Sequence, residues 1–219
     1  MSRKGTDGGE LAKLYGPGKT ELLNMYLDLA TTAYAMGGRR ALELPAPRTT
    51  AAHESGHAVL HATVDDPIYQ VSIWYVPAAN GYAGACDFVP GSPEIRINAC
   101  KQPHEALRYA ANLVAGPLAE LLLAADDYRH ASSLDEWLGA GAMIKGASVA
   151  LACDPHDLYG RVTEVVWHRL TAERGIMEKL QRLLLQQGRV RGPKLTAILV
   201  PVHRLDLVAA ILLPRKGAR

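Results

Sequence analysis

The chain has 219 residues, of which 48% are hydrophobic, and a formal net charge of +2 at pH 7. This hydrophobic content supports a packed core and excludes a wholly disordered chain, and the small net charge gives no reason to expect nucleic acid as a partner. The three cysteines, Cys86, Cys100 and Cys153, contain no CxxC pair, so a thiolate zinc site is not indicated and a reducing compartment is expected.

The N-terminal residues predict a flexible leader followed by a helix and a linker. Residues 1–19 are polar and rich in glycine, and they lack the apolar core of a secretion signal. Residues 20–48 combine a helical pattern over 21–36 with a linker that contains Pro45 and Pro47. No apolar run reaches the roughly 18 residues that a membrane span needs, so we expect a cytoplasmic protein without a membrane span.

The next segment predicts a helix and a small sheet. Good helix formers and a capping threonine place a helix over about residues 49–64, and the sequence Asp-Asp-Pro ends it. Alternation of apolar and polar residues over 71–75 predicts a strand, and a second strand over 82–89 returns after the turn signal Asn80-Gly81.

The second half of the chain is predicted to be helical. Apolar spacing gives helices over residues 103–125 and from about residue 135, and a long helical region over 157–187 that Gly188 ends. A short helix is expected from Pro193. The expected fold class is therefore mainly α, of the α+β type, with a small sheet around residues 70–90.

The pentapeptide His-Glu-Ser-Gly-His at residues 53–57 has the spacing of a zinc-binding helix. Residues four apart project from the same face of a helix, so His53 and His57 can bind one metal ion through their imidazoles. Glu54 is rotated by one position and can serve as general base toward a water whose pKa zinc lowers to about 7. The alternative interpretation is a pair of ordinary histidines without a metal.

A catalytic zinc site needs a third protein ligand and an open position. His61 continues the series, but eight residues of straight helix rise about 12 Å, too far for one ion to meet both His53 and His61. We therefore predict that His61 is a packed residue or supports the ligands. Asp135, at the start of a predicted helix, and Glu120, on the helix over residues 103–125, are both candidates, and spacing does not choose between them.

Residues 49–199 resemble the peptidase domain of the FtsH-type metalloproteases, which are membrane-bound zinc proteases coupled to an AAA ATPase. Residues 50–59, Thr-Ala-Ala-His-Glu-Ser-Gly-His-Ala-Val, are similar to the zinc-binding helix of that family. Shorter similarities follow in the same order along the chain, at residues 66–73, at residues 81–84, at residues 115–121 with the GRAAEEL helix, at residues 133–140 with the segment that carries the third ligand, and at residues 183–199.

The resemblance implies a helical zincin-like fold over residues 49–199, one Zn²⁺ per chain and Asp135 as the third ligand. It leaves Glu120 a structural or supporting role. The chain departs from the family at three positions, where an arginine, a second glutamate and an asparagine are usual: Pro117, Leu121 and Leu134. Residues 200–219 are expected to form a C-terminal extension with a basic tail.

The sequence therefore predicts a zinc metalloendopeptidase with Glu54 as general base. Since the ATPase and transmembrane parts of the family have no counterpart in the sequence, we expect it to hydrolyse flexible or unfolded polypeptides without ATP, unless a separate unfoldase or adaptor presents folded ones. The resemblance also suggests a homo-oligomer, and peptide binding along the edge of the strand over residues 81–88. Two alternatives stay open: a catalytically silent peptide-binding or regulatory protein, and a non-haem iron enzyme with the same donor types.

Overall fold

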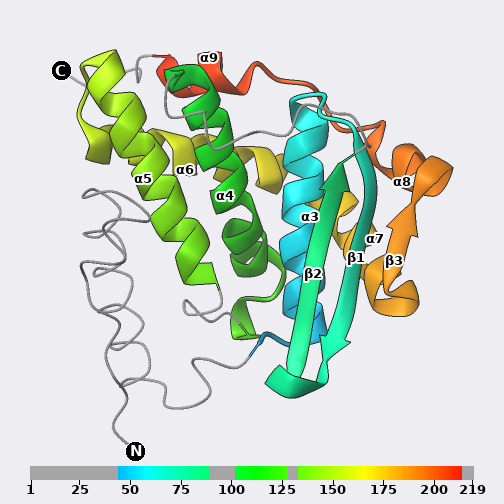
Figure 1. Ribbon diagram of the computed structural model, residues 1–219. Helices are drawn as coiled ribbons and strands as arrows, with labels where there is room; N and C mark the ends of the chain where they lie inside the picture. The colour runs from blue at the N-terminus through cyan, green and yellow to red at the C-terminus, as the bar shows by residue number, and fades with distance from the viewer. Residues whose placement is uncertain (1–43, 89–101, 128–132, 214–219) are drawn as a thin grey trace, which may run out of the picture.

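The computed structural model describes residues 44–88, 102–127 and 133–213, which form a mainly helical unit with one small antiparallel sheet (Figure 1). The predicted leader and the helix over residues 21–36 lie outside these residues, as does the basic tail from residue 214. In chain order the elements are α3 (Pro47–Thr63), β1 (Ile68–Val76), η2 (Pro77–Ala79), β2 (Gly81–Phe88), α4 (Pro103–Leu123), η4 (Ala125–Asp127), α5 (Leu134–Leu151), α6 (Pro155–Ala172), α7 (Arg174–Gln187), β3 (Arg189–Arg191), α8 (Gly192–Leu199) and α9 (Leu207–Leu212).

Helix α3 lies between α4 on one side and the sheet on the other, while α5 covers the far side of α4 (Figure 1). Because α3 is covered on several sides, nearly all of its residues are buried and its apolar residues are mostly small. The helix begins at Pro47, two residues before the predicted start, because proline fits the first helical position, where no N–H bond is lost. Its predicted end near Val64 is confirmed.

Helices α3 and α4 approach closely through small residues. A Cβ added at Gly56 would stand 2.5 Å from both the carbonyl oxygen of Ala115 and the Cβ of Ala119. A larger residue at position 56 would therefore push the helices apart. This close approach brings the histidines of α3 next to Gly116 and Glu120 of α4.

The sheet has the strand order β2-β1-β3, with both pairs antiparallel. The predicted hairpin of β1 and β2 is confirmed, and its connection contains Asn80 in the left-handed region at φ 46°. Strand β3 was not predicted, because three residues are too few for a periodic pattern. It follows Gly188, whose φ of 68° ends α7, and it pairs with residues 70–72.

The long helical region predicted over residues 157–187 is two helices, α6 and α7, which meet at Glu173. The carboxylate of Glu173 is buried; it pairs with Arg169 and accepts a hydrogen bond from the backbone N–H of His203 at 3.2 Å. These contacts hold the segment between α8 and α9, residues 200–206, at the junction of α6 and α7. Among the described residues, no helix is both long and apolar enough to span a membrane.

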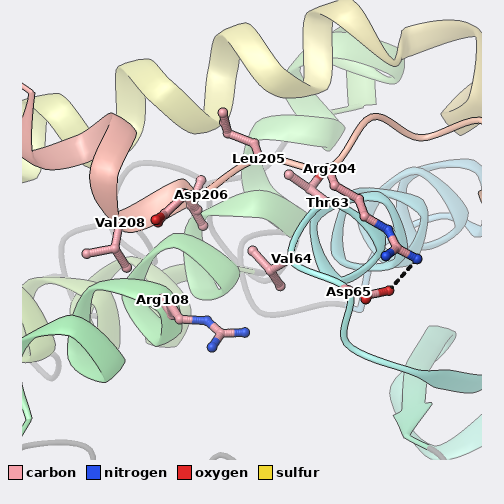
Figure 2. Close-up of a pocket in the computed structure, with 9 residues that line it drawn as sticks. Thr63, Val64, Asp65, Arg108, Arg204, Leu205, Asp206 and Val208 are labelled. Atoms are coloured by element: carbon pink, nitrogen blue, oxygen red, sulfur yellow. Dashed lines mark ion pairs between the residues drawn. The ribbon is translucent and has the colours of Figure 1, made fainter.

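Residues 204–208 also lie against the end of α3 and line an open pocket of about 340 Å³ (Figure 2). The backbone N–H of Leu205 donates to the carbonyl of Thr63 at 3.0 Å, and Arg204 pairs with Asp65 at 2.8 Å. Arg108 of α4 lines the same pocket. The residues that line it include none of the predicted site residues.

Candidate metal centre

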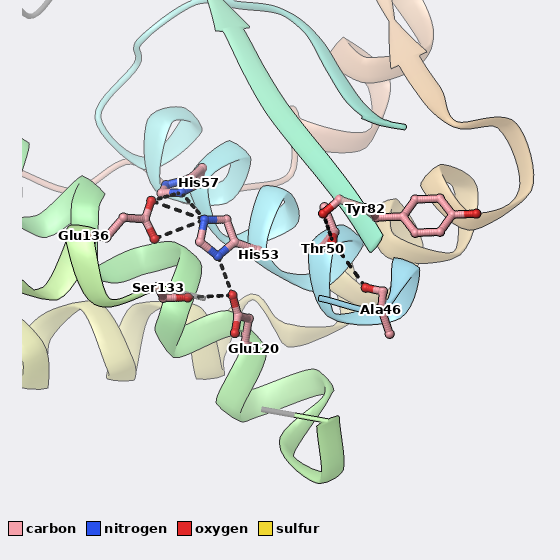
Figure 3. A network of polar contacts seen from close by, with 8 residues as sticks. All are labelled: Ala46, Thr50, His53, His57, Tyr82, Glu120, Ser133 and Glu136. Carbon is pink, nitrogen blue, oxygen red and sulfur yellow. Dashed lines mark hydrogen bonds and ion pairs between the residues drawn. The ribbon is translucent and has the colours of Figure 1, made fainter. Parts of the chain in front are cut away.

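Two imidazoles and one carboxylate converge where α3, α4 and α5 meet (Figure 3). Nε2 of His53 lies 3.0 Å from Nε2 of His57, and Oε1 of Glu136 lies 3.2 Å and 3.1 Å from these two nitrogens. One ligand atom from each residue falls within 4.8 Å of the others. Within the described ranges, this is the one group of three or more His, Cys, Asp or Glu side chains with such a spacing.

The carboxylate that meets the two imidazoles is that of Glu136, and not that of Asp135, which was the predicted third ligand. Asp135 is exposed, because consecutive residues of a helix are rotated by about 100° around its axis. Glu136 is in phase with the buried face of α5, which continues through Ala140 and Ile144. This four-residue spacing could have identified Glu136 from the sequence. However, α5 also carries apolar residues on its other faces, so the sequence does not show which face is buried.

Each histidine has a partner on the nitrogen that faces away from the cluster. Nδ1 of His53 lies 2.6 Å from Oε1 of Glu120, and Nδ1 of His57 lies 3.4 Å from Oδ1 of Asn112. A bound metal ion would take the lone pairs of the two Nε2 atoms in place of their protons, while the Nδ1 protons stay directed at Glu120 and Asn112, as metal-binding histidines require. Glu120, the other candidate ligand, therefore lies behind His53 and supports it.

Gly116 of α4 leaves the space that the imidazoles occupy. A Cβ at this position would stand 2.5 Å from Nε2 of His53 and 2.7 Å from Nε2 of His57. No side chain larger than hydrogen fits there without moving the two rings.

The charges of the cluster suit a cation. Burial alone would lower the pKa of His53, but the carboxylates of Glu120 and Glu136 raise it well above its usual range. Burial would raise the pKa of Glu136, but hydrogen bonds from His53 and His57 lower it to about 2, so the carboxylate is ionised. Its Oε2 is buried without a hydrogen bond and lies 3.2 Å from Nε2 of His53 as the second oxygen of this ion pair. An ionised carboxylate beside two imidazole nitrogens is a set of ligands that fits a divalent metal ion such as Zn²⁺.

Glu54 stands beside this cluster, between α3 and the sheet. Its side chain is 6% exposed, and a Cβ built on Gly84 of β2 would stand 2.5 Å from its Oε1. Burial raises the pKa of Glu54, the nearby carboxylates of Glu136 and Asp87 add to this, and the two imidazoles oppose it. A raised pKa makes the carboxylate a better proton acceptor.

His61 lies outside the cluster, as predicted. It is 3% exposed, and its Nδ1 lies 3.3 Å from Oδ2 of Asp66, whose other oxygen pairs with Arg108 at 3.1 Å. The third histidine of the series is therefore a buried residue with a carboxylate partner.

Two of the three predicted metal ligands, His53 and His57, meet in the structure with Glu54 next to them. Glu136 was missed, and the partners Asn112 and Ser133 were not predicted either. The chain matches no protein-family model and no curated protein.

Proposed function

We propose that the protein is a zinc metallopeptidase in which His53, His57 and Glu136 hold the metal ion. The observation that carries the proposal is the convergence of two Nε2 atoms and one carboxylate within 4.8 Å, with the buried Glu54 beside them. Two histidines and one carboxylate are the ligand set of hydrolytic zinc sites that keep a coordination position open.

The chain's own residues supply proton transfer and orientation. A bound Zn²⁺ would supply a Lewis acid for the scissile carbonyl and would lower the pKa of the attacking water. Glu54 accepts the proton that the water loses, and it then donates this proton to the nitrogen of the leaving amine as the C–N bond breaks. Glu120 and Asn112 hold the two imidazoles through their Nδ1 atoms, so the ligands need no reorganisation during the reaction.

The substrate class follows from the strand beside Glu54. Strand β2 is at an edge of the three described strands, and its Gly84 touches Glu54. At Tyr82 the outer side of β2 is already used, because its N–H donates to the carbonyl of Pro45 at 3.0 Å. An extended peptide that pairs with β2 beyond Tyr82, at Gly84, would pass next to the general base. We therefore propose flexible or unfolded polypeptides as substrates, with a separate unfoldase or adaptor required for folded ones.

A zincin-like fold and a relation to the FtsH-type peptidases are part of the same proposal. Three features support them in chain order: the helix with the two histidines, the antiparallel strand pair, and a later helix that begins with an acidic ligand.

Incubation of the purified protein with unfolded casein and Zn²⁺ tests the proposal. Glu54→Gln is expected to lower the cleavage rate by about 10²–10⁴-fold, the usual contribution of a general base, while zinc binding is retained. Glu178→Gln is the matched control, because Glu178 lies on α7 outside the cluster and its half-exposed side chain pairs only with the exposed Arg174 of the same helix. Cleavage that survives Glu54→Gln would contradict the mechanism, and a wild-type protein that binds zinc without cleaving would favour the silent peptide-binding alternative.

The donor set also favours a second candidate, a non-haem iron enzyme, since two histidines and one carboxylate bind Fe(II) in oxygenases. The buried Glu54 beside the site favours hydrolysis, because an oxygenase needs no such base. Elemental analysis of protein purified without added metal separates the two, and iron in excess of zinc would support the second candidate.

A further inference from the structure

Ser133 uses its hydroxyl in an unusual way for a residue that begins a helix. It occupies the N-cap position of α5 and is completely buried. An N-cap serine ordinarily accepts a hydrogen bond from a backbone N–H of the first turn, but the side chain of Ser133 makes no such bond. Instead, its hydroxyl donates to Oε1 of Glu120 at 2.9 Å.

The oxygen that Ser133 reaches is the same atom that holds His53. Oε1 of Glu120 lies 2.6 Å from Nδ1 of His53, and the side chain of Glu120 is 1% exposed (Figure 3). One buried oxygen atom on α4 therefore joins His53 of α3 to the N-cap residue of α5. Since Ser133 and Glu120 are both buried, the hydrogen bond between them faces little competition from solvent.

The spacing along α5 links this contact to the metal ligand. Ser133 and Glu136 are three residues apart, so they project from the same side of the chain at the start of α5. Ser133 faces Glu120, and Glu136 faces His53 and His57. A shift or rotation at the start of α5 would move both side chains together.

We propose that Ser133 is a positioning residue, which fixes the start of α5 on Glu120 and thereby sets the distance of the Glu136 carboxylate from the two imidazoles. The proposal rests on the metal centre described above and extends it. The hydroxyl stabilises the geometry of the site rather than the helix, because it leaves the first turn of α5 without a side-chain cap.

The test compares variants that remove a buried hydroxyl from α5. Ser133→Ala removes the hydroxyl, and Ser133→Gly also removes it while keeping a residue that is favoured at N-cap positions. Ser148→Ala is the matched control, because Ser148 is also buried on α5 but donates only to the carbonyl of Lys145 in the same helix. Circular dichroism of each protein confirms that it is folded.

Zinc affinity, measured by competition with a chromophoric chelator, and the visible absorption spectrum of the Co²⁺-loaded protein are the readouts. We expect both Ser133 variants to weaken zinc affinity by about 10–100-fold, the range for partners that orient metal ligands, and to change the Co²⁺ spectrum. Ser148→Ala should leave both unchanged. In a Glu120→Ala background, Ser133→Ala should have little further effect, because the hydroxyl acts through Glu120.

The two ways in which the idea can fail are distinguishable. Unchanged zinc affinity and an unchanged Co²⁺ spectrum in a folded Ser133→Ala or Ser133→Gly protein would overturn the role of Ser133 and leave the proposed function standing. A wild-type protein that binds no divalent metal would overturn both.

Discussion

Gly84 of β2 lies directly against Glu54 of α3, so closely that a Cβ at Gly84 would stand 2.5 Å from both Cγ and Oε1 of the glutamate. The strand proposed to bind the substrate thus also limits where the proposed general base can lie. The contact is with Glu54 and not with the proposed metal ligands. A substitution at Gly84 should therefore affect the position of the base without affecting metal binding.

Gly84→Ala is therefore expected to displace Glu54 and to lower kcat by up to about 100-fold, since a displacement of about 1 Å at a reacting group can cost that much. Zinc affinity should stay near that of the wild type. Steady-state kinetics measures kcat, and a zinc titration measures the affinity. Gly146→Ala is the control, because a Cβ at Gly146 meets nothing within 4 Å. A wild-type kcat in Gly84→Ala would contradict the placement of Glu54.

Gly116→Ala should weaken zinc binding, which Gly84→Ala should leave unchanged. A methyl group at this position would overlap the imidazoles of His53 and His57, so the metal ligands rather than the base would move. We expect zinc affinity to fall by roughly tenfold or more, as for other changes that misorient ligands. Chelator competition measures this, with Gly175→Ala as control because Gly175 has open space around it. Wild-type affinity would mean that the rings are not held against α4.

Glu136→Gln and Asp135→Asn form a matched pair for the third ligand. The two residues are adjacent and acidic, but one lies in the cluster and the other is exposed. Loss of the anionic ligand in Glu136→Gln should weaken zinc binding by more than the roughly 10–100-fold typical of supporting partners, and Asp135→Asn should leave it unchanged. Isothermal titration with Zn²⁺ distinguishes the two. A larger loss of zinc affinity in Asp135→Asn than in Glu136→Gln would show that Asp135 is the ligand.

The burial of His61 should make the stability of the protein depend on pH. Burial lowers the pKa of His61 below the ordinary value for histidine of about 6.5, and Asp66 only partly opposes this. Between the folded-state pKa and about 6.5, the unfolded chain binds more protons than the folded one, so the free energy of unfolding rises with pH in this window. His61 therefore costs stability as the pH falls below about 6.5, by about 1.4 kcal/mol for each unit by which its pKa is lowered.

Urea unfolding of the metal-free protein at pH 7.5 and pH 5.5 measures this effect against His61→Gln, which lacks the titrating group. The stability advantage of the wild type over His61→Gln should be larger at pH 7.5 and smaller at pH 5.5. Other histidines titrate in both proteins, so their contributions cancel in the difference. An advantage that grows toward low pH would show that His61 binds its proton more tightly in the folded state.

The features that could be predicted from the sequence are those that depend on local geometry. The spacing of His53 and His57 placed both imidazoles on one face of α3, because a helix repeats every 3.6 residues. The same periodicity gave α4, and alternation gave the hairpin of β1 and β2. The short elements β3 and α9 were not predicted, because a few residues carry little periodic signal. The break at Glu173 was not predicted either, because it involves a contact with His203, which lies 30 residues further along the chain.

The acidic residue that completes the cluster could not be chosen without the packing of the helices. Asp135 and Glu136 differ by about 100° around α5, and the choice between them depends on which side of α5 packs against α4. Since α5 is apolar on several faces, its sequence does not specify that side, and the packing of Ala140 and Ile144 into the core settles it. The contacts of Glu120 and Gly84 with the site were hidden for the same reason: they join residues brought together by packing rather than by spacing along the chain.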